Sequence, residues 1–308
     1  MLRAINPNGE YPMSKSLDFE NYLSQMKQSL KLQGLQPKTV QAYCRTLRRV
    51  NERLNKPLNE LTAKDLKDYF ASLVDEYSWS TVKLDRCALV FFYTHVLERE
   101  WQWIKIVKAP RIKSIPVVLT QDEVIHVLSQ LEKPRYKAVL TLIYTCGLRI
   151  SEALHLRTED INREKMTIHI RNSKGNKDRL VPLPYLTLAV LQWYWRMHRN
   201  RQLLFPKFVG LPERIQRATQ TMEIGTVQSA FKAALFDSGI NKNATVHTLR
   251  HSYATHLVEA GVHMRVIQEI LGHASPVSTA IYAQISKPAE NDSAGRINKM
   301  VQKLSKLF

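Results

Sequence analysis

The stretch VHTLRHSYATHLVEAGVHMRVIQEILGHASPVSTAIYAQI, from Val246 to Ile285, is the one around which the rest of the chain is organised. Within it, His247 and Arg250 lie one helical turn apart, and His273 and Tyr282 follow near later helix ends. Few sequences space a guanidinium, two imidazoles and a phenol so regularly. We therefore expect this stretch to carry the reactive side chains and the other elements to position them.

The second half of the chain, which contains this stretch, is rich in helical signals. Apolar side chains recur there at helical spacing. Helices are expected at 120–131, 136–145, 185–200, 226–238, 248–260 and 264–271, with a short one near Tyr282. Thr120 and Glu123 form a capping box that opens the first of them, and Gly147 closes the second. Residues 207–225 show no period, so no structure is assigned to them.

One segment alternates in polarity instead. Met166, Ile168 and Ile170 fall on one face and polar residues on the other, which predicts a strand. The turn NSKGNKD and the return run RLVPL complete a hairpin. Because proline has no backbone N–H, Pro182 indicates either that the second strand is an edge strand or that Pro182 lies at its end. The second half is therefore predicted to be an α+β domain with a small antiparallel hairpin.

The first half predicts a small all-α domain. Apolar stripes indicate four amphipathic helices, and Thr62 with Asp65 forms a capping box for the third. The fold class is therefore mainly α, with a helical bundle before the α+β domain. The expected divisions are a disordered arm at 1–14, the bundle at 15–106, a basic extended linker at 107–116, the second domain at 117–290 and a C-terminal helix at 291–308.

The C-terminal helix carries an apolar stripe with no later element to pack on. The stripe consists of Ile297, Met300, Val301 and Leu304. We therefore expect this helix to dock on a neighbouring protomer.

The composition favours a polyanionic partner. The net charge is +18, and both halves contribute to it: residues 1–116 hold 19 basic and 12 acidic side chains, and the remainder holds 26 and 15. Nucleic acid is the expected partner, because each neutralised phosphate releases counterions. The dispersed Cys44, Cys87 and Cys146 indicate reduced core thiols in a cytosolic protein. No apolar run reaches the ~18 residues of a membrane span, and no signal peptide is expected.

The chain contains the side chains needed to break a phosphodiester bond. That reaction requires a nucleophile, cationic donors for the non-bridging oxygens and an acid for the leaving oxygen. Arg149, in TCGLRISEAL, and Arg250 each provide a planar fork of donors. Lys174 lies beside a glycine in the hairpin turn, and Tyr282 is a phenol that needs neighbouring cations to act as a nucleophile. Glu152, one turn from Arg149, is a candidate acceptor for its guanidinium.

The order Arg149, Lys174, His247, Arg250, His273, Tyr282 resembles the tyrosine recombinase family, also called the lambda-integrase or Xer-like family. The flanking motifs GLR, SKGNKDRLVPL, HTLRHSYATHL, LGH and IY extend the resemblance over residues 117–285. It implies that the two arginines clamp the scissile phosphate, that Lys174 protonates the leaving oxygen, and that Tyr282 attacks to form a 3′-phosphotyrosyl link. It implies no metal and no other cofactor.

The same resemblance predicts the partners. The first domain would be the family's SAM-like core-binding domain, and both domains would clamp double-stranded DNA. A free monomer would assemble as a tetramer on two DNA sites, in the cytoplasm of a prokaryote, with a mobile element as one possible origin. The candidate DNA contacts are Lys38, Arg45, Arg48, Arg49, Lys83, Arg111, Lys113 and Lys177.

Several alternatives stay open at this point. Lys177 competes with Lys174 for the role of acid, since both are in the hairpin turn. A metal-dependent hydrolase would use His247 and His251, although no carboxylate or cysteine adjoins them. A DNA-binding protein without catalysis, or a type IB topoisomerase, would share much of the pattern. The sequence leaves open the target site, the accessory proteins, and the choice between integration, excision and dimer resolution.

Overall fold

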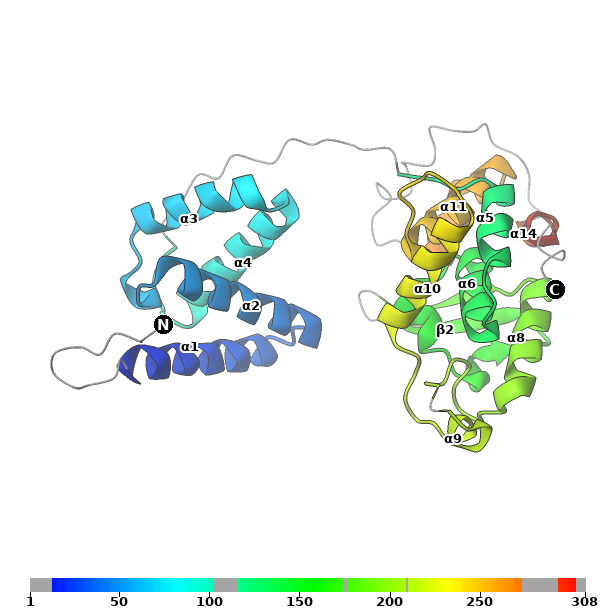
Figure 1. The fold of residues 1–308 in the computed structure, drawn as a ribbon, viewed down its shortest axis with the longest axis horizontal. Coiled ribbons are helices and arrows are strands. Elements are labelled where there is room, and N and C mark those ends of the chain that lie inside the picture. Colours follow the sequence, from blue (N-terminus) through cyan, green and yellow to red (C-terminus); the bar gives the residue numbers. More distant parts are fainter. Residues whose placement is uncertain (1–12, 102–115, 174–176, 209, 273–292, 303–308) are drawn as a thin grey trace. The chain divides into compact units, whose positions relative to one another are not determined.

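The computed structural model describes residues 13–101, 116–173, 177–208, 210–272 and 293–302. The chain divides into two compact units, 1–112 and 113–308 (Figure 1). Each unit has a hydrophobic core of its own. Within the described ranges, no helix combines the length and apolar character that a bilayer crossing requires.

The first unit is the four-helix bundle that the apolar stripes predict. Its helices are α1 (Met13–Leu32), α2 (Pro37–Leu54), α3 (Ala63–Glu76) and α4 (Trp79–His95). The capping box at Thr62 and Asp65 is present at the start of α3. Leu47, Leu73 and Phe92, from three different helices, are fully buried in the shared core.

A buried carboxylate ties three of these helices together. Asp85, on α4, is completely buried and accepts hydrogen bonds from Thr46 Oγ1 at 2.7 Å and Tyr69 Oη at 2.6 Å. It also accepts one from Arg49 Nη2 at 3.0 Å. Arg49 was expected to project outward from α2 toward DNA, and that placement is wrong: its side chain is only 18% exposed and is paired with Asp85. The buried Asp85 carboxylate requires a cationic partner. The apolar spacing along α2 does not show that Arg49 is that partner, because Asp85 lies on another helix.

We predict that Asp85→Ala destabilises the first unit by about 3–5 kcal/mol, because it leaves the Arg49 charge and two hydroxyls without their acceptor. Calorimetry of the full chain should show the corresponding transition lowered by more than about 10 °C. The matched control is Asp68→Ala, on the exposed face of α3, which should stay within about 0.5 kcal/mol of wild type. Equal melting of the two variants would contradict the role given to Asp85.

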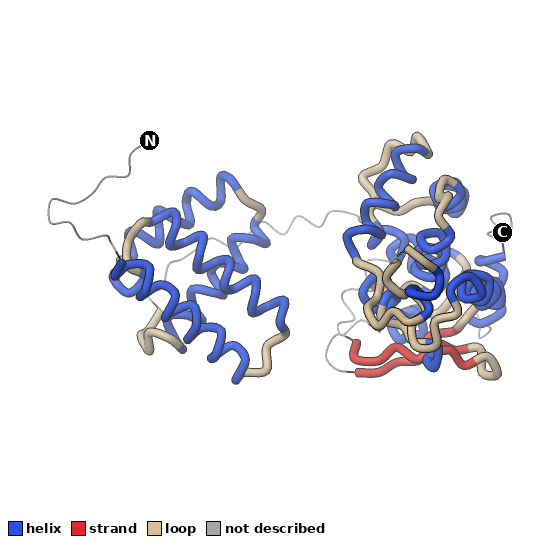
Figure 2. The backbone as a smooth tube through the Cα atoms, turned by 60° about the horizontal axis from the view of Figure 1, so that its bottom comes forward, coloured by secondary structure: helices blue, strands red, loops and turns tan. Residues whose placement is uncertain are grey.

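The second unit packs helices on one face of a small sheet (Figure 2). The helices are α5 (Gln121–Ser129), α6 (Pro134–Cys146), α7 (Ile150–Leu154), α8 (Tyr185–His198), α9 (Pro212–Gln216), α10 (Ile224–Asp237), α11 (Val246–Glu259), α12 (Met264–Leu271) and α14 (Ser293–Gln302). Between α7 and α8 lie strands β1 (Ile161–Asn162), β2 (Thr167–Ser173) and β3 (Lys177–Pro182).

The sheet is antiparallel, in the order β1-β2-β3. Ile168 pairs with Val181, and both are fully buried against the helices. Leu180, on the opposite face, is 63% exposed. Pro182 is the last residue of the edge strand β3, as its missing N–H predicts. The hairpin that the alternating pattern predicts is therefore present, with β1 as an additional strand.

Among the short elements of the second unit that were not predicted are α7, β1 and α9. Each spans at most five residues, too few for a helical or alternating period to appear. Helix α9 lies within 207–225, where no structure was assigned. The two ends of this segment are joined by a β-bridge between Pro206 and Thr221 and by an ion pair between Lys207 and Glu223 at 2.7 Å.

The C-terminal stripe has a partner in its own chain, so the expectation that it lacks one is wrong. Ile297 and Val301, on α14, are at most 1% exposed, and Met300 is buried with them in the core of the second unit. Helix α14 packs against α8 and α11. Sequence order hides this contact, because the helices that receive the stripe come earlier in the chain. Leu304 lies outside the described residues.

Candidate active site

The junction between α6 and α7 presents Arg149. Helix α6 ends at Cys146, and Gly147 follows in the left-handed conformation with φ +61°. A Cβ atom at Gly147 would lie 2.5 Å from the ring of Tyr253, so only glycine fits. Arg149 is then the first flanking residue of α7, and its side chain is 25% exposed. The turn at Gly147 therefore places the partly exposed guanidinium of Arg149 at the start of α7.

Arg250 lies deeper, on the inner face of α11. Its side chain is 3% exposed. Nη1 donates to the Gly147 carbonyl at 2.7 Å, and Nη2 donates to the Leu271 carbonyl at 2.6 Å. These bonds tie α11 to the turn after α6 and to the end of α12, so the Arg250 fork has a fixed orientation.

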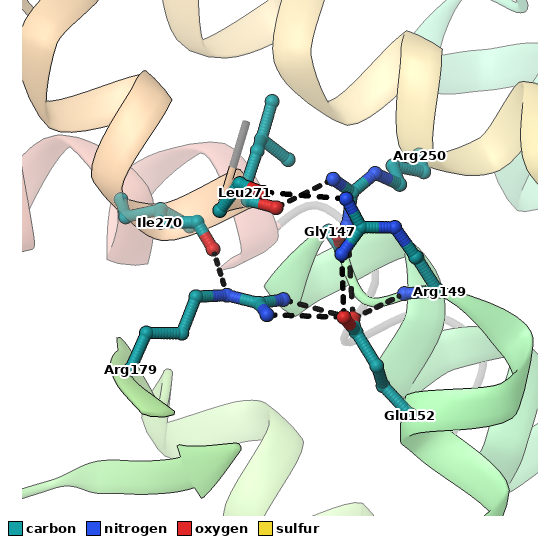
Figure 3. Close-up of polar contacts among 8 residues, drawn as sticks. Gly147, Arg149, Glu152, Arg179, Arg250, Ile270 and Leu271 are labelled. Carbon is teal, nitrogen blue, oxygen red and sulfur yellow. Dashed lines mark hydrogen bonds and ion pairs between the residues drawn. The ribbon is translucent and has the colours of Figure 1, made fainter. Parts of the chain in front are cut away.

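Glu152 is the acceptor that gathers the arginines (Figure 3). Its carboxylate accepts from Arg149 Nη1 at 2.6 Å and from the Arg149 backbone N–H at 2.8 Å. Arg179, on β3, donates to both oxygens at 3.0 and 2.8 Å, and Arg250 Nη1 lies 3.8 Å away. Burial by itself would raise the pKa of Glu152, but the Arg179 hydrogen bonds and charge, followed by those of Arg149, outweigh it and lower the pKa to about 2.

The end of α12 is held by the same three arginines. The Ile270 carbonyl accepts from Arg179 Nε at 2.8 Å, and the Leu271 carbonyl accepts from Arg250. The Gly272 carbonyl accepts from Arg149 Nη2 at 3.3 Å. The last carbonyls of a helix lack partners within the helix, and cations are favoured beside them. The helix end and the arginine cluster therefore stabilise each other.

His247 faces His251 one turn along α11. Their ring centroids are 4.5 Å apart and the rings are nearly perpendicular. Burial, then the charges of Arg250 and Arg149, lower the pKa of His247, and burial lowers that of His251 to about 4. His247 is therefore neutral at pH 7 and can accept a proton. Among the described residues, no group of three His, Cys, Asp or Glu side chains is arranged to hold a metal ion.

Three predicted site residues lie outside the described residues: Lys174, His273 and Tyr282. The described part brings together Arg149, Glu152 and Arg250 and places His247 near both arginines. Strands β2 and β3 flank the turn that contains Lys174, and α12 ends at Leu271, two residues before His273.

Sequence reasoning missed Arg179. A signal for it was present, since Arg179 shares strand parity with the buried Val181, and an arginine on the inward face of a strand requires a buried partner.

Besides Arg49, the candidate DNA contacts fall into three groups. Exposed on α2 and α4 are Lys38, Arg45, Arg48 and Lys83. Arg111 and Lys113 lie outside the described residues, and Lys177 is the first residue of β3, paired through its backbone with Ser173.

Comparison with known proteins places the chain in a family. Residues 117–288 match the phage integrase family, and residues 22–103 match its N-terminal SAM-like domain. A putative integrase/recombinase of Sinorhizobium fredii, y4qK, is 33% identical over 264 residues, covering 85% of this chain and 83% of the relative. The tyrosine recombinase XerA of Pyrococcus horikoshii is 34% identical over 260 residues, covering 83% and 86%.

A solved structure shows the same fold. The XerH site-specific recombinase, bound to its difH substrate in a pre-cleavage complex, aligns with a TM-score of 0.65 and 21% identity, over 92% of this chain and 89% of that chain. The chain belongs to the phage integrase family. As a member of this family it is a site-specific DNA recombinase of the tyrosine class.

We predict that Gly147→Ala disrupts the site as well as the fold. Left-handed backbone costs an alanine about 1–2 kcal/mol, and the contact with Tyr253 adds about 1–3 kcal/mol of overpacking. Gly239→Ala is the matched control, because Gly239 has φ +68° but nothing within 4 Å of its added Cβ. Calorimetry should therefore show a larger loss for Gly147→Ala, together with slower DNA cleavage. Equal stability losses would show that the close approach to Tyr253 is without consequence.

Proposed function

We propose that this recombinase cleaves DNA by direct attack of Tyr282 on a phosphate held by Arg149 and Arg250. The observation that supports it is the gathering of these two guanidinium groups, from α11 and the α6–α7 turn, on the buried Glu152 carboxylate. Two fixed forks of donors suit a phosphate whose negative charge grows in the transition state. Each fork contributes about 3 kcal/mol, by analogy with oxyanion holes.

The bonds and protons balance without a cofactor. The Tyr282 oxygen forms a bond to phosphorus, the P–O5′ bond breaks, and a 3′-phosphotyrosyl link conserves the energy for rejoining. The phenolic proton passes to a neutral imidazole, and His247 is kept in the neutral form because burial and the nearby arginine charges lower its pKa. Lys174 gives a proton to the leaving 5′ oxygen. His273 assists at the phosphate.

Both units contact the same DNA duplex in this proposal. The exposed Lys38, Arg45 and Arg48 on α2 and Lys83 on α4 form the contact of the first unit with the phosphate backbone. Arg111, Lys113 and Lys177 extend this contact. Recombination joins two sites and requires four strand cleavages, so four protomers assemble on the paired sites in the cytoplasm of a prokaryotic cell.

Tyr282→Phe tests the nucleophile, because it removes a single oxygen atom. The variant should bind DNA with near wild-type affinity and form no covalent complex. Denaturing gels of protein mixed with labelled DNA measure this directly. Tyr185→Phe, which alters an exposed tyrosine on α8, is the control and should cleave like wild type. DNA linked to the Tyr282→Phe protein would assign the attack to another residue.

Replacing the bridging leaving oxygen with sulfur tests the acid. An alkoxide leaving group (parent pKa ~16) needs a proton and a thiolate (~8.5) hardly does. Lys174→Ala should therefore cleave ordinary DNA about 10²- to 10⁴-fold slower than wild type and approach wild type on the sulfur substrate. Arg250→Ala should stay slow on both, because its phosphate contacts are still missing.

The control for the acid is Lys177→Ala, which should cleave both substrates at close to the wild-type rate. Sulfur rescue of Lys177→Ala, with Lys174→Ala left slow, would assign the proton to Lys177 instead.

A further inference from the structure

The side chain of Arg179 forms its hydrogen bonds with residues outside the sheet, on α7 and α12. Arg179 projects from β3, and its side chain is 9% exposed. Nη1 and Nη2 donate to separate oxygens of Glu152 at 3.0 and 2.8 Å, while Nε donates to the Ile270 carbonyl at 2.8 Å. One guanidinium thus joins the hairpin that contains Lys174, the carboxylate that holds Arg149, and the end of the helix that precedes His273 (Figure 3).

The geometry of these contacts requires the planar fork of an arginine. A lysine ammonium is a point charge on a flexible stem and cannot bond both oxygens of a carboxylate in one plane while reaching a third acceptor. The space is also closely fitted. A Cβ atom at Gly272 would lie 3.0–3.1 Å from the Arg179 side chain.

We propose that Arg179 is a positioning residue of this recombinase, which fixes Glu152 and the end of α12 so that Arg149 and Arg250 face the scissile phosphate. This inference rests on the phosphate-binding roles proposed above for those two arginines. In this proposal Arg179 acts through Glu152 and the end of α12 and does not bind the DNA itself.

Loss of Arg179 should affect Arg149 because both arginines bond the Glu152 carboxylate. With Arg179 occupying both Glu152 oxygens, the carboxylate is held in one orientation while Arg149 bonds one edge of it. Without Arg179, the carboxylate can rotate toward Arg149 and Arg250 and draw their donors away from the phosphate. A displacement of about 1 Å at a reacting group costs roughly 10²-fold in rate.

The sheet supplies a matched control for this idea. Arg171, on β2, donates Nε to the buried Asp160 at 2.7 Å and pairs with Glu159 at 3.2 Å. It is also an arginine bonded to a buried carboxylate. Asp160 and Glu159 belong to the turn that precedes β1, whereas Glu152 belongs to α7, so loss of Arg171 should lower stability without disturbing the carboxylate that holds Arg149.

The test uses the full-length protein and a duplex whose cleavage site has been mapped from wild-type covalent complexes. Arg179→Lys and Arg179→Gln should bind the uncleaved duplex within about threefold of wild type, and single-turnover cleavage should be about 100-fold slower for both. Arg171→Lys and Arg171→Gln should cleave at close to the wild-type rate. Wild-type cleavage by Arg179→Lys would overturn the proposal, because charge alone would then suffice.

A double variant tests whether Arg179 acts through Glu152. Arg179→Gln leaves Glu152 paired with Arg149 and near Arg250, and adding Glu152→Gln takes the carboxylate away from both, so the melting temperature should not recover. Cleavage should not recover either. Because both residues act as one unit, the double variant should be as slow as the slower single variant and should not show the product of the two losses.

Two outcomes count against the inference here. Cleavage that recovers together with the melting temperature would show a purely structural role, and losses that multiply would show that Arg179 acts independently of Glu152. Failure of the proposed function is recognised separately, because the wild-type protein would then form no covalent complex with DNA.

Discussion

The second unit depends on one buried carboxylate and the cations around it. Glu152 draws Arg149, Arg179 and Arg250 toward a single point, and those guanidinium groups in turn hold the end of α12. Three cations this close would repel one another strongly without the carboxylate, and a carboxylate this buried would not stay ionised without them. The arrangement of α7, α11, α12 and β3 around the site follows from this mutual requirement.

Much of this fold could be predicted from local patterns. The four helices of the first unit, the hairpin, and α12 at 264–271 all follow from apolar periodicity, because each presents one face to a core. The capping boxes at Thr62 and Thr120 and the glycine stop at Gly147 mark the ends, since unpaired helix termini need such partners. The pairing of Arg149 with Glu152 was also expected from their three-residue spacing, and in the structure it forms at the start of α7, where Arg149 is the N-cap residue.

The parts that could not be predicted depend on contacts between segments far apart in the sequence. Arg179 shares strand parity with a buried residue, but its partners, Glu152 on α7 and the Ile270 carbonyl on α12, are known only once β3 is packed against those helices. Arg49 reads as an outward residue until Asp85 is known to lie behind it. The stripe on α14 has no later element to pack on, and its partners, α8 and α11, precede it in the chain. In each case the deciding interaction joins elements that no periodicity connects.

The Asp85 network in the first unit bears on how this protein could be redirected to new DNA. Its donors come from α2 and α3 and its acceptor from α4, and the exposed Lys38, Arg45, Arg48 and Lys83 are not among its members. Buried hydrogen bonds therefore stabilise the helical bundle, and the exposed side chains contribute little to its stability. Libraries at Lys38, Arg45, Arg48 and Lys83, which are the DNA contacts proposed above for this unit, would change surface side chains without removing a member of the Asp85 network. Such a division between a fixed support and an exchangeable surface is what directed evolution of a DNA-recognition module requires.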